Sequence, residues 1–455
     1  MRSAKRLLVA VPAALSVVPP LLVAGLVAQH ARNMLWKDQW GMVGYMAEVT
    51  HGVPDPAWLT WQVNEHRMPV AFAVQGALAW WTRWDLRAEA WVNVVVAALT
   101  GLVLTALIRK TIADRSPVAA AWVLLACSVL LFSLAGGINW TWGTMNANFI
   151  VVLATVWLAW RLLAWTGRWR QTLGLVVTAT IATFTFGTGV VLLAAVPAAL
   201  AVPTRRVPRR TLHVLATAAW AVLVVTLYFW GWHPPFGVAP PVLHTDRPWD
   251  YVSYVAGYLG VATGTRSLRG ATSSGAVMAM ALVAAATWTW SRAPSARTAM
   301  LPWLVVAATA VANGFVTAYG RLDAPGSALF VRYLPAATCF AIGLAGMLGI
   351  ALIEVLARSP RLGAVLVAVT ALGVASVGGT LRIGWMQGAY EMATHAGILN
   401  LGRHCLTDCA TASDRCFLLT CWDAKVARAQ CPLLAEARIG PFATAPPRDP
   451  ASAPR

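Results

Sequence analysis

The sequence predicts an all-α polytopic membrane protein, and three observations predict this fold class. Of the 455 residues, 58% are apolar and only 11% are charged, with a mean hydropathy of +0.64, whereas a soluble domain carries roughly 25% charged residues. Apolar runs of about 20 residues recur, and each is long enough to cross a hydrocarbon layer about 30 Å thick as a helix. The charged residues, finally, are divided unevenly between alternate loops.

We expect about eleven transmembrane helices. The first follows three basic residues and lacks a small-residue cleavage site near its end, so it should remain as an uncleaved anchor. Two spans are short, and Gly187 and Gly189 predict a tight turn between them near the outer surface. The expected spans are 7–29, 88–108, 118–135, 147–165, 172–186, 188–202, 211–230, 276–290, 300–318, 332–356 and 363–380.

Two loops of this arrangement are long. The first external loop, 30–87, contains the apolar stretch 69–84, which has about 16 residues and is too short to cross the membrane. We therefore expect a re-entrant or amphipathic helix there. The loop 231–275 is the longest between spans, a length that is usually functional or folded on itself, and its residue roles stay open.

Lysine and arginine in the short loops indicate the orientation. Six basic clusters fall on one face, which we assign to the inside, so the N-terminus lies inside and the C-terminus outside. The outer face then receives every Asp and Glu except Asp114 and Glu354. Orientation signals and contact with anionic lipids explain most of the +18 net charge, and we expect no nucleic-acid partner. The clusters are Arg2/Lys5/Arg6, Arg109/Lys110/Arg115, Arg161/Arg168/Arg170, Arg205/Arg206/Arg209/Arg210, Arg292/Arg297 and Arg358/Arg361.

The cysteines follow the same division. Cys127 and Cys339 fall inside predicted spans and should pack as small apolar residues. Residues 1–380 are expected to form the transmembrane domain, and 381–455 an external tail with five cysteines. An oxidising compartment predicts two disulfides with one thiol left over, the pairing remaining open. A zinc site is the alternative, which the lack of a C-x-x-C pair disfavours. The tail cysteines are Cys405, Cys409, Cys416, Cys421 and Cys431.

Two polar motifs of the first external loop carry groups suited to chemistry. Asp38 lies between two tryptophans and is a candidate general base or metal ligand. Asn64-Glu65-His66-Arg67 places an acid, an imidazole and a guanidinium within three residues, a set suited to proton transfer and phosphate binding. The alternative is a solvated loop whose tryptophans mark the membrane interface.

Two further motifs follow on the same predicted face. The loop from Ile138 to Asn148 contains Trp140, Trp142 and Asn146, side chains that suit a hydroxyl-rich ligand, although interfacial Trp and turn-forming Asn would give the same pattern. Arg321 starts the loop after one span, and Arg332-Tyr333 begins the next span near its outward N-terminus. Two arginines beside a helix N-terminus predict a phosphate-binding pair; contact with lipid phosphates is the alternative.

Several signals are missing from the sequence. It contains no Walker A loop, no dinucleotide-binding glycine motif and no zinc-peptidase or serine-hydrolase signature. Charges inside the spans are few, and no duplicated half is apparent, which disfavours ion-coupled carriers. A transporter or flippase for a lipid-linked substrate remains the main alternative to an enzyme, and a scaffold protein with a partner-binding tail is a third hypothesis.

Taken in order, the four motifs resemble those of the C-type integral-membrane glycosyltransferases, which use polyprenyl-phosphate sugars, and of uncharacterised bacterial membrane proteins of this kind. The resemblance spans residues 30–335. Two positions depart from the pattern: Gln39 stands where a second acid often follows Asp38, and Val331 stands where Ser would precede Arg332-Tyr333.

The resemblance implies that a hexosyl or pentosyl group moves from a polyprenyl-phosphate donor to a glycan or lipid acceptor. This would occur at the outer face of a bacterial cytoplasmic membrane, among membrane lipids. A divalent cation stays open as a cofactor. The catalytic candidates are Asp38, Glu65 and His66, and the substrate-binding candidates are Asn64, Arg67, Trp140, Trp142, Asn146, Arg321, Arg332 and Tyr333.

We predict that the tail cysteines react differently before and after reduction in intact cells. Four of the five should be held in disulfides and become accessible to a membrane-impermeant thiol reagent only after a reductant is added, because the tail is expected outside the membrane. Labelling of all five without reductant would contradict the prediction.

Overall fold

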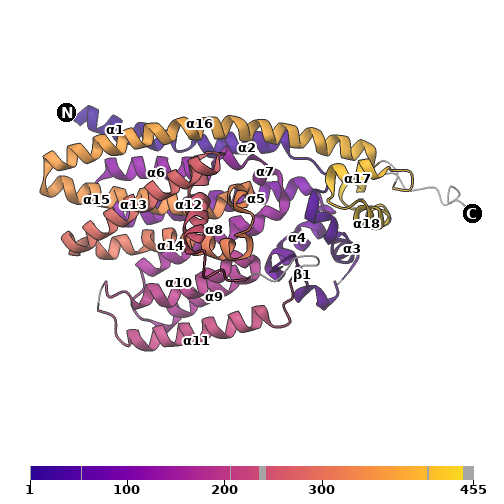
Figure 1. The fold of residues 1–455 in the computed structure, drawn as a ribbon, viewed down its shortest axis with the longest axis horizontal. Coiled ribbons are helices and arrows are strands. Elements are labelled where there is room, and N and C mark those ends of the chain that lie inside the picture. Colours follow the sequence, from indigo (N-terminus) through magenta and orange to yellow (C-terminus); the bar gives the residue numbers. More distant parts are fainter. Residues whose placement is uncertain (1, 53, 205, 235–241, 407–408, 444–455) are drawn as a thin grey trace, which may run out of the picture.

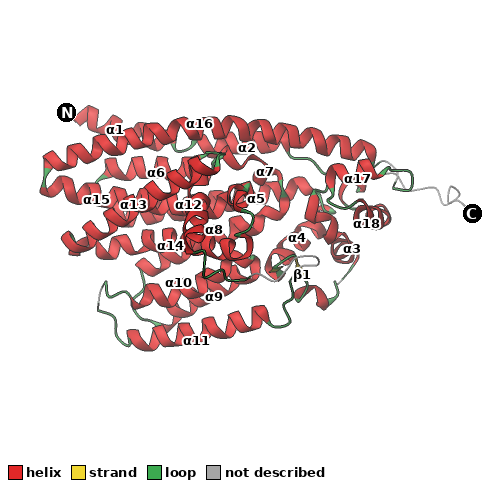
Figure 2. Ribbon diagram, in the orientation of Figure 1, coloured by secondary structure: helices red, strands yellow, loops and turns green. Residues whose placement is uncertain are grey.

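A computed structural model describes residues 2–52, 54–204, 206–234, 242–406 and 409–443. Within these ranges the regular structure is helical apart from one two-stranded hairpin, β1 (Gln62–Val63) and β2 (His66–Arg67) (Figure 2). Nine described helices are long and apolar enough to cross a membrane. The two remaining predicted spans are the shorter helices α9 (Trp169–Thr185) and α10 (Val190–Ala201). The predicted fold class is therefore confirmed.

Most helices run side by side in one elongated bundle (Figure 1). The first predicted span consists of two helices, α1 and α2. The helices of the bundle are α1 (Arg2–Leu15), α2 (Val18–His30), α5 (Leu86–Ile108), α6 (Pro117–Leu131), α8 (Asn146–Leu163), α9, α10, α11 (Arg210–Phe229), α12 (Pro248–Gly260), α13 (Leu268–Arg292), α14 (Arg297–Arg321), α15 (Leu334–Arg358) and α16 (Pro360–Cys405).

Side-chain caps set the starts of several helices. Asp85 accepts the backbone N–H of Arg87 at the start of α5, and Ser116 accepts that of Ala119 at the start of α6. Such caps satisfy backbone donors that have no partner within the helix. The predicted tight turn between α9 and α10 is also present, and a Cβ on its Gly189 would overlap the backbone of Ala182.

The structure differs from the sequence prediction in the long loop 231–275, which contains α12. This helix buries Tyr251, Tyr254 and Tyr258 on one face. The three tyrosines recur at the spacing of a helical face, but the charged residues just before them make the segment look like a loop.

The last helix of the bundle, α16, is longer than the predicted span 363–380. Its 46 residues correspond to about 69 Å at 1.5 Å per residue, so it extends well beyond a hydrocarbon layer about 30 Å thick. The predicted boundary at residue 380 lies within this helix. It docks closely on the bundle at Gly388, where a Cβ would overlap the carbonyl of Leu134.

The first loop and the tail fold together into one outer unit, which we define as the described residues 31–52, 54–86, 395–406 and 409–443. One buried apolar cluster joins Leu35, Trp40 and Phe72 of the loop to Phe417 and Leu434 of the tail. The unit lies at the end of the bundle opposite the N-terminus (Figure 1). Its helices are α3 (Val43–His51), α4 (Pro69–Thr82), α17 (Asp414–Thr420) and α18 (Ala424–Ala437).

Helix α4 is the expected short helix of the first loop. It has 14 residues, and Trp80 and Trp81 near its C-terminal end are 70% and 79% exposed. Exposed tryptophans are typical of the membrane–water interface.

The tail forms two disulfides, Cys405–Cys416 and Cys409–Cys431, and leaves Cys421 free and buried. The predicted number of bridges is therefore confirmed, and the structure selects one pairing among those left open.

The ion pairs of the described residues agree with the predicted division of the loops. Arg115 and Glu354, both assigned to the inner face, are 2.8 Å apart, and Arg321 and Glu65, both assigned to the outer face, are also 2.8 Å apart. Each ion pair within the described ranges joins two residues of the same predicted face. The side of the membrane that each face occupies stays a prediction.

We predict that Gly388→Ala destabilises the protein, because the added methyl group must displace backbone atoms at the contact between α16 and Leu134. Overpacking of this kind costs typically about 1–3 kcal/mol, and thermal unfolding in detergent should show a lower Tm. Gly378 of the same helix faces open space, with no atom within 4 Å of the point that a Cβ would occupy. Gly378→Ala is therefore the matched control and should leave Tm unchanged or raise it. Equal Tm values for both variants would contradict the prediction.

Candidate active site

The β-hairpin of the first loop sets the direction of the Asn64–Arg67 motif. Gln62 pairs with Arg67 and Val63 with His66, which leaves Asn64 and Glu65 as the turn. Asn64 has φ of 51°, a left-handed conformation that asparagine adopts more readily than most residues. Asn64 is exposed, whereas Glu65 and His66 are partly buried.

Glu65 forms an ion pair with Arg321, although the two residues are far apart in the sequence. Arg321 Nη2 donates to Glu65 Oε1 at 2.8 Å, and Nε2 of His66 lies 3.9 Å from the same oxygen. Burial raises the pKa of the Glu65 carboxyl, but the neighbouring His66 and Arg321 outweigh this effect, so the pKa lies below its ordinary value. Glu65 is therefore ionised at neutral pH.

His66 is held against the turn between α9 and α10. Its ring lies 4.2 Å from that of Phe186, centroid to centroid, and a Cβ on Gly187 would overlap the imidazole. Burial lowers the pKa of His66 to about 4, with Arg332 and Arg321 acting in the same direction and Glu65 against them. The imidazole is therefore neutral at pH 7 and is available as a hydrogen-bonding group.

Asp38 has an environment different from that of Glu65. It lies in a 3₁₀ turn, Lys37–Met42, and is half-buried. Burial raises the pKa of its carboxyl, and the charge of Glu65 acts in the same direction. Arg332, Lys37 and a hydrogen bond from Trp422 oppose the rise without cancelling it. Glu65 and Arg332 thus both lie within electrostatic reach of Asp38.

Arg332 stands in a short turn, Val331–Tyr333, directly before α15. Its guanidinium lies 5.1 Å from the ring of Phe330 and 5.2 Å from that of Tyr333, and one of its nitrogens donates to the Tyr333 hydroxyl at 3.4 Å. Its Nε is buried without a hydrogen-bond partner. Asn139 holds this turn in place by donating to the carbonyl oxygen of Val331 at 2.6 Å.

Arg67 lies at the edge of this group. Its backbone N–H donates to the Tyr228 hydroxyl at 3.3 Å, and its side-chain Nε is buried without a partner. Gly231 approaches the other end of the guanidinium.

The candidate residues Trp140 and Asn146 belong to the second external loop, Ile138–Asn148, and lie within the packed interior. Trp140 is buried, stacks on Phe132 and donates to the carbonyl of Ser133 at 3.1 Å. Asn146 is buried and accepts a hydrogen bond from Gln75 at 3.2 Å. The structure therefore does not bring these two residues into the group around Asp38.

Trp142 and its neighbours also connect interior segments. Trp142 is partly buried, and its Nε1 has no partner. Asn93 of α5 donates to the carbonyl oxygens of Asn139 and Trp142 at 3.0 and 3.1 Å. The loop therefore supports the turn that carries Arg332, and its contact with a ligand stays a prediction.

The sequence analysis missed Glu89, which lies within the expected span 88–108. This fully buried carboxylate accepts hydrogen bonds from Gln39 and Trp84, each at 2.8 Å. Gln39 faces Glu89, although it directly follows Asp38 in the sequence. An acid near the start of an apolar span was the signal that pointed to Glu89.

The described residues do not fit a metal centre. Within the ranges that the structure describes, no group of three or more His, Cys, Asp and Glu side chains is arranged to hold an ion. Glu65 is already bonded to Arg321, and Arg332 and Lys37 act on Asp38. We therefore derive no step that uses a metal.

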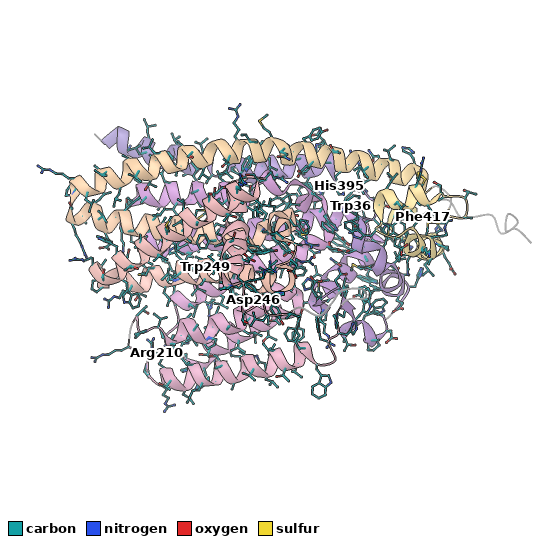
Figure 3. The ribbon with its side chains drawn as sticks, viewed as in Figure 1. Trp36, Arg210, Asp246, Trp249, His395 and Phe417 are labelled. Atoms are coloured by element: carbon teal, nitrogen blue, oxygen red, sulfur yellow. A yellow bond between two sulfur atoms is a disulfide. The ribbon has the colours of Figure 1, made fainter. Side chains whose placement is uncertain are left out.

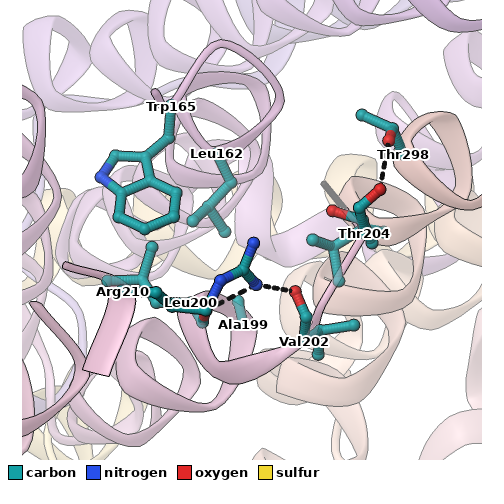
Figure 4. Close-up of a pocket in the computed structure, with 9 residues that line it drawn as sticks. Leu162, Trp165, Ala199, Leu200, Val202, Thr204, Arg210 and Thr298 are labelled. Atoms are coloured by element: carbon teal, nitrogen blue, oxygen red, sulfur yellow. Dashed lines mark hydrogen bonds between the residues drawn. The ribbon is translucent and has the colours of Figure 1, made fainter. Parts of the chain in front are cut away.

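Figure 4 shows a small pocket of a different kind. Its lining includes Leu162, Trp165, Leu200 and Thr298, together with Arg210, which donates to the carbonyl oxygens of Leu200 and Val202. Arg210 belongs to a cluster assigned to the inner face, so this pocket is separate from the group around Asp38. Figure 3 shows Arg210 far from Trp36 and His395, whose rings meet edge to face with their centroids 4.6 Å apart where α16 meets the outer unit.

We compared the chain with protein families, curated proteins and solved structures, and only the solved structures gave a match, which is weak. Neither a protein-family model nor a curated protein matches the chain. Among solved structures, it is similar to the oligosaccharyltransferase of Archaeoglobus fulgidus in complex with Zn and sulfate. The TM-score is 0.44 and the identity 13%, over 87% of this chain and 56% of that one. For the apo form the TM-score is 0.42 and the identity 14%, over 92% and 55%.

The chain spans about half the length of these archaeal structures. A TM-score of 0.44 is too low to assign it to their fold. The function is therefore argued from the residues around Asp38.

Proposed function

We propose that this protein is a membrane glycosyltransferase. It transfers a hexosyl or pentosyl group from a polyprenyl-phosphate donor to a hydroxyl of a glycan or lipid acceptor. The reaction takes place at the outer face of a bacterial cytoplasmic membrane. One observation carries the proposal: two carboxylates and two guanidiniums from separate parts of the chain form one connected group. Glu65 bonds to Arg321, and both Glu65 and Arg332 act electrostatically on Asp38.

Asp38 is the proposed general base. A carboxylate whose pKa is raised accepts a proton more readily near neutral pH, and burial raises the pKa of Asp38. Glu65 suits this role less well, because it accepts a hydrogen bond from Arg321 and its pKa is lowered. Glu65 would instead hold Arg321, while the neutral His66 offers a hydrogen bond to a substrate hydroxyl.

The proposed reaction is a single displacement at the anomeric carbon. Asp38 takes the proton of the acceptor hydroxyl, whose oxygen forms the new bond to that carbon. The bond between the carbon and the phosphate oxygen breaks, and its electron pair stays on the phosphate. Arg332, with Arg321 beside it, stabilises the charge that develops there. The configuration at the anomeric carbon is inverted.

The buried Nε of Arg332 is a second argument for an anionic ligand. It has no partner, and a buried donor without a partner is unfavourable unless a ligand satisfies it. Phe330 and Tyr333 lie beside the guanidinium, and Tyr333 accepts one of its hydrogen bonds, so the buried Nε is the donor that a phosphate oxygen would satisfy. A polyprenyl chain attached to that phosphate can lie in the hydrocarbon layer beside the apolar helices.

We predict that Asp38→Asn removes transfer while the protein remains folded, since asparagine keeps the size of the side chain and loses the charge that accepts a proton. General-base catalysis contributes roughly 10²–10⁴-fold, so kcat should fall by about this factor. The measurement is transfer from labelled polyprenyl-phosphate hexoses and pentoses.

The control is Asp55, an exposed acid of the same loop that caps a short turn. Asp55→Asn retains the cap and should keep normal activity. More than about a tenth of wild-type turnover in Asp38→Asn would place the base elsewhere.

We predict that Arg332→Gln raises KM for the donor more than it changes KM for the acceptor. A hydrogen bond to a charged group contributes about 1.5–3 kcal/mol, which corresponds to a change of roughly ten- to a hundredfold in donor affinity. Arg87→Gln is the control, because Arg87 is an outer-face arginine that is 59% exposed and paired with Asp85. Unchanged donor KM in Arg332→Gln would assign this arginine to lipid anchoring.

A further inference from the structure

The C-terminal tail reaches the candidate active site through Trp422, which lies between α17 and α18. The side chain of Trp422 acts on the carboxylate of Asp38 and lowers its pKa. Its ring also lies 4.0 Å from the ammonium of Lys37, and the ring of Trp36 lies 4.6 Å from the same ammonium. Two indoles, one from the first loop and one from the tail, therefore enclose Lys37.

The backbone at Lys37 is in an unfavourable conformation. Its φ is 50°, in the left-handed region that non-glycine residues adopt only where the surrounding structure holds them. Cation–π contact with the two indoles supplies such a restraint. Since Asp38 directly follows Lys37, the conformation of Lys37 determines the direction in which the Asp38 carboxylate points.

The part of the tail that carries Trp422 is well fixed, although Trp422 itself is 70% exposed. Two disulfides join α16 and the chain just after it to α17 and α18. Thr420 accepts a hydrogen bond from the buried Trp40 at 3.3 Å, and Asp423 caps the start of α18. Residues on either side of Trp422 are thus anchored to the outer unit.

We propose that Trp422 is a positioning residue for Asp38, supplied to the active site by the disulfide-bonded tail. This inference rests on the proposed function, in which Asp38 is the general base. The charged groups that act on Asp38 are Arg332, Glu65 and Lys37, and Trp422, whose ring lies 4.0 Å from the Lys37 ammonium, acts on the same carboxylate.

The direction of the effect follows from the chemistry. An N–H donor stabilises the ionised form of a carboxylate and lowers its pKa. Removal of the donor therefore raises the pKa of Asp38, and the acidic limb of the profile of kcat against pH moves to higher pH. A purely structural role for Trp422 would lower kcat without moving that limb.

The test uses the full-length protein in lipid vesicles. Trp422→Phe keeps a ring beside Lys37 and removes the donor, so the acidic limb should move up by about half a pH unit to one pH unit, with little change in donor KM. Trp422→Ala also removes the ring and should lower kcat at least about tenfold. Trp80 of α4 has the same 70% exposure, and Trp80→Phe should match the wild type. An unmoved acidic limb in Trp422→Phe would overturn the proposal.

A second measurement needs no enzymatic activity. Carbodiimide coupling of an amine to carboxyl groups, followed by peptide mass spectrometry, reports the protonation and accessibility of Asp38. Near pH 6, Asp38 should be labelled several-fold more in Trp422→Phe than in the wild type or Trp80→Phe. Equal labelling would overturn the role of Trp422. Increased labelling in a protein that transfers no sugar from any donor would support the contact and count against the proposed glycosyltransferase.

Discussion

The buried carboxylate of Glu89 joins the bundle to the outer unit. One of its oxygens accepts a hydrogen bond from Gln39 and the other accepts one from Trp84, so an acid at the start of α5 holds two segments of the first loop. Gln39 in turn accepts the backbone N–H of Trp36 at 2.9 Å and closes the turn that carries Asp38. A buried carboxylate is costly without partners, and both of its oxygens are satisfied here.

This arrangement also explains the glycine at position 143. A Cβ there would overlap the Glu89 carboxylate, so only glycine lets the second loop approach so closely. The same loop supplies Asn139, which holds the turn of Arg332. Glu89 and its neighbours therefore set the separation between Asp38 on one side and Arg332 on the other.

Much of the fold follows from the sequence because the membrane sets the length of an apolar helix. The basic and acidic residues of each loop indicate the face of the bundle on which that loop lies. The same reasoning groups Asp38, Glu65, His66, Arg321 and Arg332, since loops on one face of a bundle end close together.

Residue type alone does not reveal which way a side chain points. Trp140 and Asn146 fit a ligand-binding loop as well as an interior, and the structure has them in the interior. The packing of the tail on the first loop depends on contacts between segments more than 300 residues apart, as in the Trp40–Thr420 hydrogen bond, whose partners are separated by 380 residues. No local pattern encodes such contacts.

The outer unit has a consequence for how the protein is made. Its apolar cluster combines residues near the beginning of the chain, such as Leu35 and Trp40, with residues near its end, such as Phe417 and Leu434. A ribosome adds about 5–20 residues per second, so the early half of this cluster waits tens of seconds for the late half. During that interval every intervening span must enter the bilayer, and the early half stays without its partner. A nascent chain that stops before Cys409 therefore has neither Trp422 nor the two disulfides of the tail.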